Sequence, residues 1–241
     1  MYGLLIATTS IVCLLLIEKI IKKNKVVPVN DFWNLALILI PSAIIGGRIY
    51  HILDYWDYYS KFPNEILNFK NGGMGIFGAI IFCAITVYFF AKSKKQNPLI
   101  YLDLIVLFAP IVQIGGRIGN FFNKELFGFP TNKPWGIYIP TELRPEQFLN
   151  SLKFHPLFAY ESILLFILFS FLADMYLNKK ILFGTGKILG VYLIGYGLIR
   201  TLLEPLRIGN ALVVLNFDLI YLFAVTMIVV GLLIVTKNFK K

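Results

Sequence analysis

The chain has 241 residues, of which 58% are hydrophobic and only 15% are charged. This composition is typical of an integral membrane protein and excludes an ordinary soluble domain. The formal net charge of +10 would suit a nucleic-acid-binding protein, so the positions of the basic residues decide what that charge means.

Seven apolar stretches are each long enough to cross about 30 Å of hydrocarbon as a helix, which rises about 1.5 Å per residue. They cover residues 2–21, 33–52, 72–91, 99–121, 156–177, 185–206 and 212–235. The first has no basic segment before it and no small-residue cleavage site after it, so we interpret it as a retained helix rather than a signal peptide. We expect an all-α integral membrane protein with seven transmembrane helices in a single domain over residues 1–241.

Lysines gather after the first, third, fifth and seventh spans. The four clusters lie within residues 19–25, 92–95, 179–187 and 237–241, and together they hold 13 of the 23 basic residues. In a seven-span topology all four lie on one side, and the positive-inside rule makes that side cytoplasmic. We therefore expect the N-terminus outside and the C-terminus in the cytoplasm, and we expect no nucleic-acid partner.

The longest segment on the outer side, about residues 123–155, contains Pro130, Pro134, Pro140 and Pro145. Prolines at this density argue against a continuous helix. We expect an ordered cap over the outer leaflet, and outer segments of this kind often gate a site.

Three arginines lie within the spans, each near the outer end of its helix: Arg48, Arg117 and Arg200. A charge at mid-bilayer costs about 2.5–3.5 kcal/mol on insertion scales, so an intramembrane arginine indicates a buried partner or a bound anion. The alternative is that each guanidinium snorkels to the interface, which costs little near a helix end. For Arg48 a structural pair with an outer-segment acid such as Asp57 also stays open. The depth that the three share favours an anion site, and a phospholipid head group is the most abundant anion there.

Polar residues accompany two of these arginines. Asn120 lies three residues after Arg117 on the same helical face, among glycines that allow close approach. Arg200, Glu204 and Arg207 share a face at i, i+4 and i+7. Glu204 either belongs to the site or only neutralises its two neighbours.

The fifth span opens with His155, Tyr160 and Glu161 at the same outer depth. Glu161 is a candidate ion-pair partner for an arginine. His155, which precedes Pro156, is either a hydrogen-bonding residue at the helix start or an acid–base group.

Two cysteines and two histidines are the only strong candidates for zinc ligands. Cys13 and Cys83 fall in separate spans without metal-ligand spacing. We therefore expect no metal site.

The run from Gly115 to Gly128, GGRIGNFFNKELFG, resembles the signature of bacterial prolipoprotein diacylglyceryl transferases. Three further stretches agree with that family in order and spacing. They are Gly47-Arg48 followed by Asp57-Tyr58-Tyr59, His155-Pro156 followed by Tyr160-Glu161, and Tyr196-Gly197 followed by Arg200, Glu204 and Arg207. The resemblance covers nearly the whole chain.

The resemblance implies a transferase of the bacterial inner membrane that catalyses the first step of lipoprotein maturation. Such an enzyme moves the diacylglyceryl group of phosphatidylglycerol to the lipobox cysteine thiol of a prolipoprotein signal peptide, releases glycerol phosphate, and needs no metal or cofactor. The candidate catalytic residues are then Arg117, Arg200, Glu161 and His155. The candidate phosphatidylglycerol-binding residues are Arg117, Asn120, Glu125, Gly128, Tyr160, Glu204, Arg207 and Arg48.

One departure from the family pattern concerns the proton. Many members carry a histidine or tyrosine, a candidate general base, where this chain has Phe77. Because phenylalanine cannot accept a proton, either the base lies elsewhere or the activity is altered. A family member that binds phospholipid with lost or altered chemistry, and a phospholipid or anion transporter, are the alternative functions.

Overall fold

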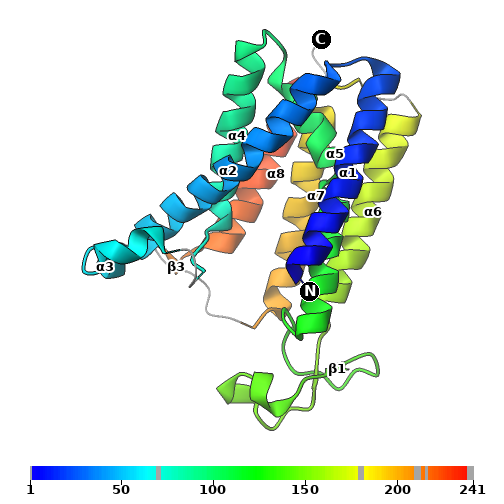
Figure 1. Cartoon of the computed structure of the whole chain (residues 1–241). Helices are drawn as coiled ribbons and strands as arrows, with labels where there is room; N and C mark the ends of the chain where they lie inside the picture. Colours follow the sequence, from blue (N-terminus) through cyan, green and yellow to red (C-terminus); the bar gives the residue numbers. More distant parts are fainter. Residues whose placement is uncertain (1, 69–71, 179–181, 209–212, 215–216, 238–241) are drawn as a thin grey trace. The chain divides into compact units, whose positions relative to one another are not determined.

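The computed structural model describes residues 2–68, 72–178, 182–208, 213–214 and 217–237. Within these residues seven helices are long and apolar enough to cross a membrane, which confirms the predicted fold class (Figure 1). They are α1 (Tyr2–Asn24), α2 (Val29–Asp54), α4 (Ile76–Ser93), α5 (Pro98–Asn123), α6 (Leu157–Leu177), α7 (Lys187–Leu203) and α8 (Leu219–Lys237). Their orientation in the membrane stays a prediction, and four of the lysines on which it rests, Lys179, Lys180, Lys240 and Lys241, lie outside the described residues.

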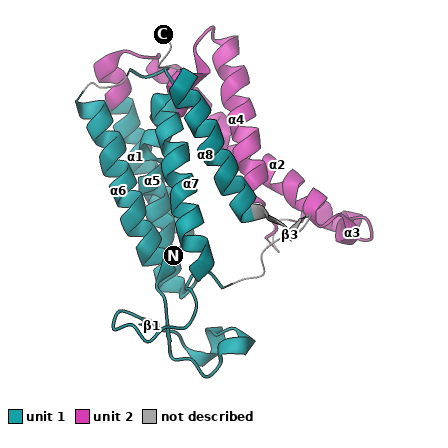
Figure 2. Ribbon diagram, turned by 180° about the vertical axis from the view of Figure 1, so that it is seen from behind, with its two compact units in different colours: residues 1–19, 103–241 teal, residues 20–102 magenta. Residues whose placement is uncertain are grey.

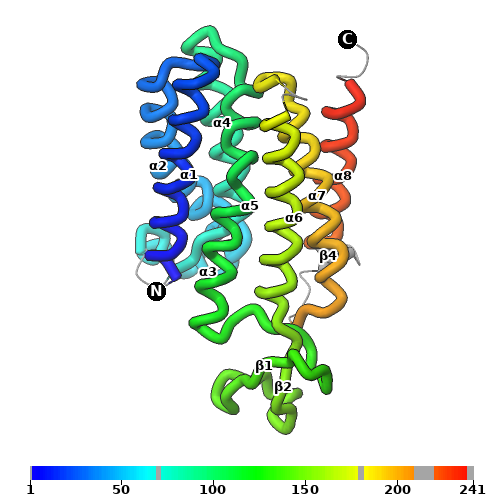
Figure 3. Tube along the Cα trace, turned by 90° about the vertical axis from the view of Figure 1, so that its right-hand side faces the viewer, coloured from blue at the N-terminus to red at the C-terminus, as the bar shows by residue number. Residues whose placement is uncertain are grey.

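The chain divides into two compact units, which Figure 2 shows in different colours. Unit 1 comprises Met1–Lys19 and Asp103–Lys241, and unit 2 comprises Ile20–Leu102, so α1 and α5 each contribute to both. In unit 1, α6 packs beside α7 and α7 beside α8 (Figure 3). The single-domain organisation expected from the sequence stays a prediction.

The glycines of the signature run bring α1 against α5 in unit 1. A Cβ atom on Gly115 would lie 2.5 Å from Oγ1 of Thr9, and one on Gly119 would lie 2.5 Å from Cδ2 of Tyr2. Real Cβ atoms essentially never lie that close to another atom, so a larger residue at either position would force α1 or its side chains to shift. Close packing of α1 is therefore one reason for the glycines that surround Arg117.

Unit 2 is built on the crossing of α2 and α4. A Cβ atom on Gly46 would lie 2.5 Å from the carbonyl oxygen of Gly78 and equally close to Cβ of Phe82. The two helices thus meet backbone to backbone. A short helix, α3 (Trp56–Tyr59), and a 3-10 helix (Pro63–Leu67) follow α2.

Three of the differences between the predicted and the observed span boundaries have a clear physical reason. Gly72 and Gly73 precede α4 rather than open it, because both have positive φ angles, of 78° and 80°. The seventh helix begins at Leu219 and not at residue 212, since strands β3 (Val213–Val214) and β4 (Phe217–Asp218) pair antiparallel before it. The β-branched valines that made this segment look like an apolar span also suit a strand. α7 ends at Leu203, just before Pro205, and a 3-10 turn (Glu204–Leu206) continues from it.

The segment between α5 and α6 has no long helix, as its prolines predict. It contains strands β1 (Ile137–Tyr138) and β2 (Lys153–Phe154), which pair antiparallel, and two 3-10 turns (Thr141–Leu143 and Glu146–Phe148). Its core is small but closed, because Ile139 and Phe154 are fully buried. It lies beyond the ends of α5 and α6 (Figures 1 and 3), and we call it the cap.

A buried carboxylate fixes the start of α7. Asp103, on α5, is fully buried and accepts hydrogen bonds from the backbone N–H groups of Gly184 (2.9 Å), Gly186 (3.0 Å) and Leu189 (3.0 Å). These donors have no partner within α7 because they precede or open the helix. Asp103 is thus a capping residue supplied by another helix.

We predict that Gly78→Ala lowers the stability of the detergent-solubilised protein. Its Cβ would overlap the Gly46 carbonyl oxygen and the Tyr50 side chain, and a backbone atom cannot move aside cheaply. Overpacking of this kind costs about 1–3 kcal/mol. The thermal midpoint, followed by tryptophan fluorescence, should fall by several degrees, whereas Gly3→Ala, with no atom near its Cβ, should leave it unchanged. Equal midpoints for both variants would contradict the close crossing.

We also predict that Asp103→Asn destabilises the protein by about 1–3 kcal/mol, because hydrogen bonds to a charged acceptor contribute about 1.5–3 kcal/mol each and an amide retains only part of them. Asp174→Asn removes a carboxylate from an exposed position near the end of α6 and serves as the control. The measurement is again the thermal midpoint, and an unchanged value for Asp103→Asn would show that the α7 cap does not depend on the charge.

Candidate functional site

The site in unit 1 is centred on the carboxylate of Glu161. It lies in the second turn of α6 and is only 2% exposed. Oε1 accepts a hydrogen bond from Nη2 of Arg117 at 2.7 Å, and Oε2 lies 3.9 Å from Nη1 of Arg200. Both arginine side chains are themselves largely buried, with 19% and 13% exposure. The Glu161 carboxylate, on α6, therefore lies between the guanidinium group of Arg117 on α5 and that of Arg200 on α7.

The charges continue beyond Arg200 toward the end of α7. Nη2 of Arg200 donates to Oε2 of Glu204 at 2.6 Å, and Nη1 of Arg207 lies 3.7 Å from Oε1 of Glu204. Together with Arg117 and Glu161 these residues form a row of alternating charges, which we call the charge row. Its three cations and two anions leave one positive charge in excess.

Asn120 and Glu125 adjoin the row on the α5 side. Nη1 of Arg117 donates to Oδ1 of Asn120 at 3.2 Å, and Nδ2 of Asn120 donates to Oε2 of Glu125 at 3.3 Å. The chain can turn back this sharply because Lys124 and Leu126 adopt positive φ angles of 55° and 54°, an uncommon conformation for residues other than glycine. Glu125 itself is exposed.

Gly128 joins three segments of the site. Its N–H donates to the carbonyl oxygen of His155 at 2.8 Å, and it forms an antiparallel bridge with Arg207. A Cβ atom here would lie 3.0 Å from Cγ of Leu157 and would clash with the Leu206 carbonyl. Its position thus fixes the backbone of the cap against the ends of α6 and α7.

His155 and Tyr160 belong to a separate hydrogen-bonded chain. Nε1 of Trp135, in the cap, donates to the Tyr160 hydroxyl at 2.7 Å, and that hydroxyl lies 3.0 Å from Nδ1 of His155. The backbone of His155 reaches the charge row through Gly128, which pairs with His155 and with Arg207. Sequence reasoning did not select Trp135, because nothing in the sequence indicates that its indole meets a tyrosine 25 residues later.

Among the described residues, two buried side-chain atoms have no hydrogen-bond partner. They are Nε of Arg117 and Oε1 of Gln113, one turn away on α5. Arg117 therefore keeps one N–H donor that no described residue uses. Tyr196 and Tyr192, whose rings stack 5.9 Å apart on α7, lie close enough to Arg117 and Gln113 respectively to interact electrostatically. The sequence signal for Gln113, which we did not select, is an amide inside an apolar run.

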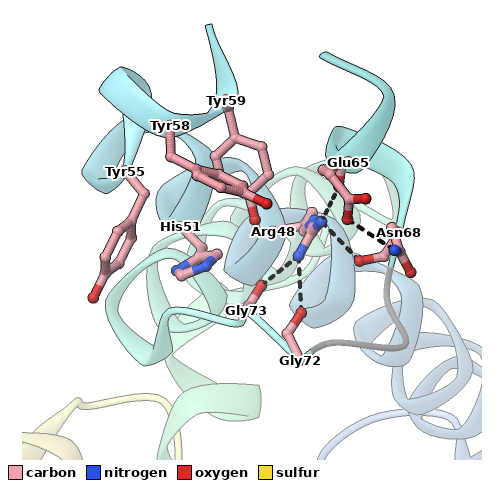
Figure 4. A pocket seen from close by; sticks show the side chains of 9 residues that line it. All are labelled: Arg48, His51, Tyr55, Tyr58, Tyr59, Glu65, Asn68, Gly72 and Gly73. Atoms are coloured by element: carbon pink, nitrogen blue, oxygen red, sulfur yellow. Dashed lines mark hydrogen bonds between the residues drawn. The ribbon is translucent and has the colours of Figure 1, made fainter. Parts of the chain in front are cut away.

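Arg48 lies in unit 2 and has different surroundings. Its guanidinium donates to five backbone carbonyl oxygens at 2.6–3.1 Å, those of Glu65, Ile66, Asn68, Gly72 and Gly73. Figure 4 shows these contacts except the one to Ile66. A guanidinium has five N–H donors, so these carbonyls can occupy all of them. The side chain is 5% exposed and lies over the Tyr59 ring. This geometry supports a structural role in holding the segment after α3, and its predicted contact with a phospholipid stays untested.

A pocket of about 380 Å³ adjoins Arg48, lined by His51, Glu65 and the tyrosines of α3 and its start (Figure 4). Phe77 lies in the first turn of α4 within the same unit, and its ring centroid is 5.8 Å from that of Tyr50. Phe77 thus packs as an aromatic residue against α2.

Comparison with known proteins agrees with the resemblance expected from the motifs. A family model described as prolipoprotein diacylglyceryl transferase matches residues 1–237. A phosphatidylglycerol–prolipoprotein diacylglyceryl transferase of Finegoldia magna is 34% identical over 243 residues, covering 100% of this chain and 91% of that protein. Proteins of the same name from a Nostoc species and from Trichormus variabilis are each 38% identical over 212 residues, covering 86% of this chain and 74% of those proteins. The chain therefore belongs to the prolipoprotein diacylglyceryl transferase family.

Proposed function

We propose that this protein is a multi-pass enzyme of the bacterial inner membrane that transfers the diacylglyceryl group of phosphatidylglycerol to the lipobox cysteine of prolipoproteins, the first step of lipoprotein maturation. Family membership over the whole chain supports the reaction. The charge row supports the place in the protein that we assign to this reaction. Three arginines and two carboxylates at the ends of membrane helices are costly without a function.

The charge row suits a phosphodiester. Its excess of one positive charge equals in magnitude the single negative charge of the phosphatidylglycerol phosphate. Arg117 retains the unused Nε–H, and the 3.9 Å contact between Arg200 and Glu161 is too long for a hydrogen bond, so Arg200 can turn a donor to a phosphate oxygen. Arginine forms bidentate contacts with phosphate and stays charged when buried. Arg117 and Arg200 are thus the proposed phosphate ligands, and Glu161 holds them in place.

In the reaction the cysteine sulfur attacks the glyceryl carbon that bears the phosphate. A C–S bond forms, the C–O bond to phosphate breaks, and glycerol phosphate leaves while the thiol proton is given up. Negative charge grows on the departing oxygen, and preorganised guanidinium groups stabilise it. A thiol of pKa about 8.5 is already a few per cent thiolate at neutral pH, so a dedicated base matters less than it would for a hydroxyl. Phe77 has no proton-accepting atom, so the proton goes to another group or to water.

The direct test incubates the purified protein in detergent with phosphatidylglycerol and a synthetic lipobox peptide, followed by mass spectrometry of the peptide. We expect a mass gain of one diacylglyceryl group that requires phosphatidylglycerol and disappears when the peptide cysteine is replaced by serine. Protein that is folded and binds phosphatidylglycerol but forms no adduct would overturn the proposal in favour of lost chemistry. Lipid movement between leaflets of proteoliposomes without an adduct would favour a transporter.

For the phosphate ligands we predict that Arg117→Ala lowers kcat/KM at least about 100-fold, the usual effect of removing one preorganised donor to a developing anion. Arg117→Lys should recover little, because an ammonium group presents its donors from one nitrogen atom and lacks the planar fork that spans Glu161, Asn120 and a phosphate. Lys153→Ala, at an exposed cap position, is the control and should keep full activity. Wild-type transfer by folded Arg117→Ala would show that phosphate binding lies elsewhere.

For the carboxylate we predict that Glu161→Gln destabilises the protein by about 3–5 kcal/mol, since removing one partner of a buried ion pair leaves its arginines uncompensated. The thermal midpoint in detergent should fall. Added phosphatidylglycerol should raise the midpoint of the variant by more than added phosphatidylcholine, which is zwitterionic. Glu142→Gln, at an exposed cap position, is the control. If both lipids restored the midpoint equally, the row would not be an anion site.

A further inference from the structure

The chain of hydrogen bonds from Trp135 through Tyr160 to His155 has a direction. An indole N–H can only donate, so the Tyr160 oxygen accepts from Trp135 in the 2.7 Å contact. The hydroxyl hydrogen of Tyr160 still needs an acceptor, and Nδ1 of His155 lies 3.0 Å from the same oxygen. Among the described residues, the Tyr160 hydroxyl has no third hydrogen-bond partner.

The hydrogen-bond pattern of these three side chains favours one tautomer of His155. If Nδ1 carried a hydrogen, the Tyr160 oxygen would accept from both neighbours and its own hydrogen would point at no described acceptor. With Nδ1 unprotonated, every group of the chain is satisfied: Trp135 donates to Tyr160, and Tyr160 donates to His155. The hydrogen of the neutral imidazole is then on Nε2, since the bond made by one ring nitrogen decides which nitrogen is protonated.

We propose that Trp135 is a positioning residue that acts through Tyr160 to hold His155 in its Nε2–H form, as a hydrogen-bond donor to an oxygen of the phospholipid substrate. The inference rests on the proposed function. It assigns His155 to donation and not to removal of the thiol proton, because its one unprotonated nitrogen, Nδ1, is already engaged by Tyr160. The backbone link through Gly128 to Arg207 keeps His155 beside the charge row, where the negative oxygens of the substrate are expected.

Two substitutions of His155 separate donation from proton removal. Glutamine carries an N–H donor on a flexible side chain but cannot act as a base, whereas phenylalanine offers neither. We expect His155→Gln to keep at least about a tenth of the wild-type kcat and His155→Phe to lose about 100-fold or more, as for other donors to a developing anion. Equal inactivity of the two variants, with thermal midpoints near wild type, would identify His155 as the base and overturn the proposal. Full activity of His155→Phe would overturn it as well.

A double-mutant cycle tests the part assigned to Trp135. We expect Trp135→Phe to lower kcat about 10-fold with little change in KM for phosphatidylglycerol, as other changes to an orienting partner do. In the His155→Gln background the same change should have less than about a twofold effect, because a glutamine has no tautomers to select. Equal effects in both backgrounds would show that Trp135 only supports the cap. Trp56→Phe, at a position as exposed as Trp135 (56% in both), is the matched control.

A spectroscopic readout keeps this inference separate from the proposed reaction. The chain has two histidines, so the ¹⁵N spectrum of labelled protein contains two imidazoles, and His51→Gln assigns them. We expect wild-type His155 to show the Nε2–H pattern and Trp135→Phe to show a mixture of tautomers. A Nδ1–H pattern in the wild type would overturn the inference whatever the enzyme does. A wild-type protein with the expected pattern but no transfer would instead count against the proposed function alone.

Discussion

The arrangement of unit 1 depends on the burial of Glu161 between two arginines. A carboxylate removed from water is stable only when it is paired and hydrogen-bonded, and Arg117 and Arg200 have the same requirement. Each therefore makes the burial of the others possible, and three helices must meet at this depth. Because an isolated guanidinium in a membrane is costly, the same contact accounts for the presence of arginines within apolar spans. Stability and the proposed anion binding thus depend on one set of charges.

The cap depends on the same helix ends. Gly128 pairs with His155 and with Arg207, so one glycine ties the start of the cap to α6 and to the segment after α7. The cap also contacts α6 through Trp135, whose indole N–H donates to the Tyr160 hydroxyl. Since Tyr160 and Glu161 are consecutive, a hydrogen bond from the cap and an ion pair from the membrane helices meet on one turn of α6. The proline-rich segment therefore contributes contacts to the candidate site and does more than cover it.

Much of this organisation is visible in the sequence, for physical reasons that differ between residues. Long apolar runs predict the seven helices because only a helix satisfies its own backbone in lipid. Asn120 is found from its i+3 spacing to Arg117, and Glu204 from its i+4 spacing to Arg200, since both contacts lie on one helix face. Arg48 shows the limit of such reasoning. Its acceptors are backbone carbonyls of a segment 17 to 25 residues away, and a carbonyl has no sequence signature.

The hairpin before α8 and the orientation of Trp135 were missed for related reasons. Valine is common both in strands and in membrane helices. A prediction from hydropathy alone therefore began the last span at residue 212. The indole of Trp135 reaches Tyr160 only because the cap folds back on α6, which is a tertiary event.

The excess charge of the row bears on which lipid the site accepts. With three cations and two anions, the row is balanced by one negative charge, and phosphatidylglycerol brings that charge with an uncharged glycerol beyond it. A zwitterionic head group would add a cation beside a row that already has an excess of positive charge, and would gain less from the same phosphate contacts. Discrimination between lipids then needs no specific contact to the glycerol. It follows from the same charge balance that allows the arginines to be buried.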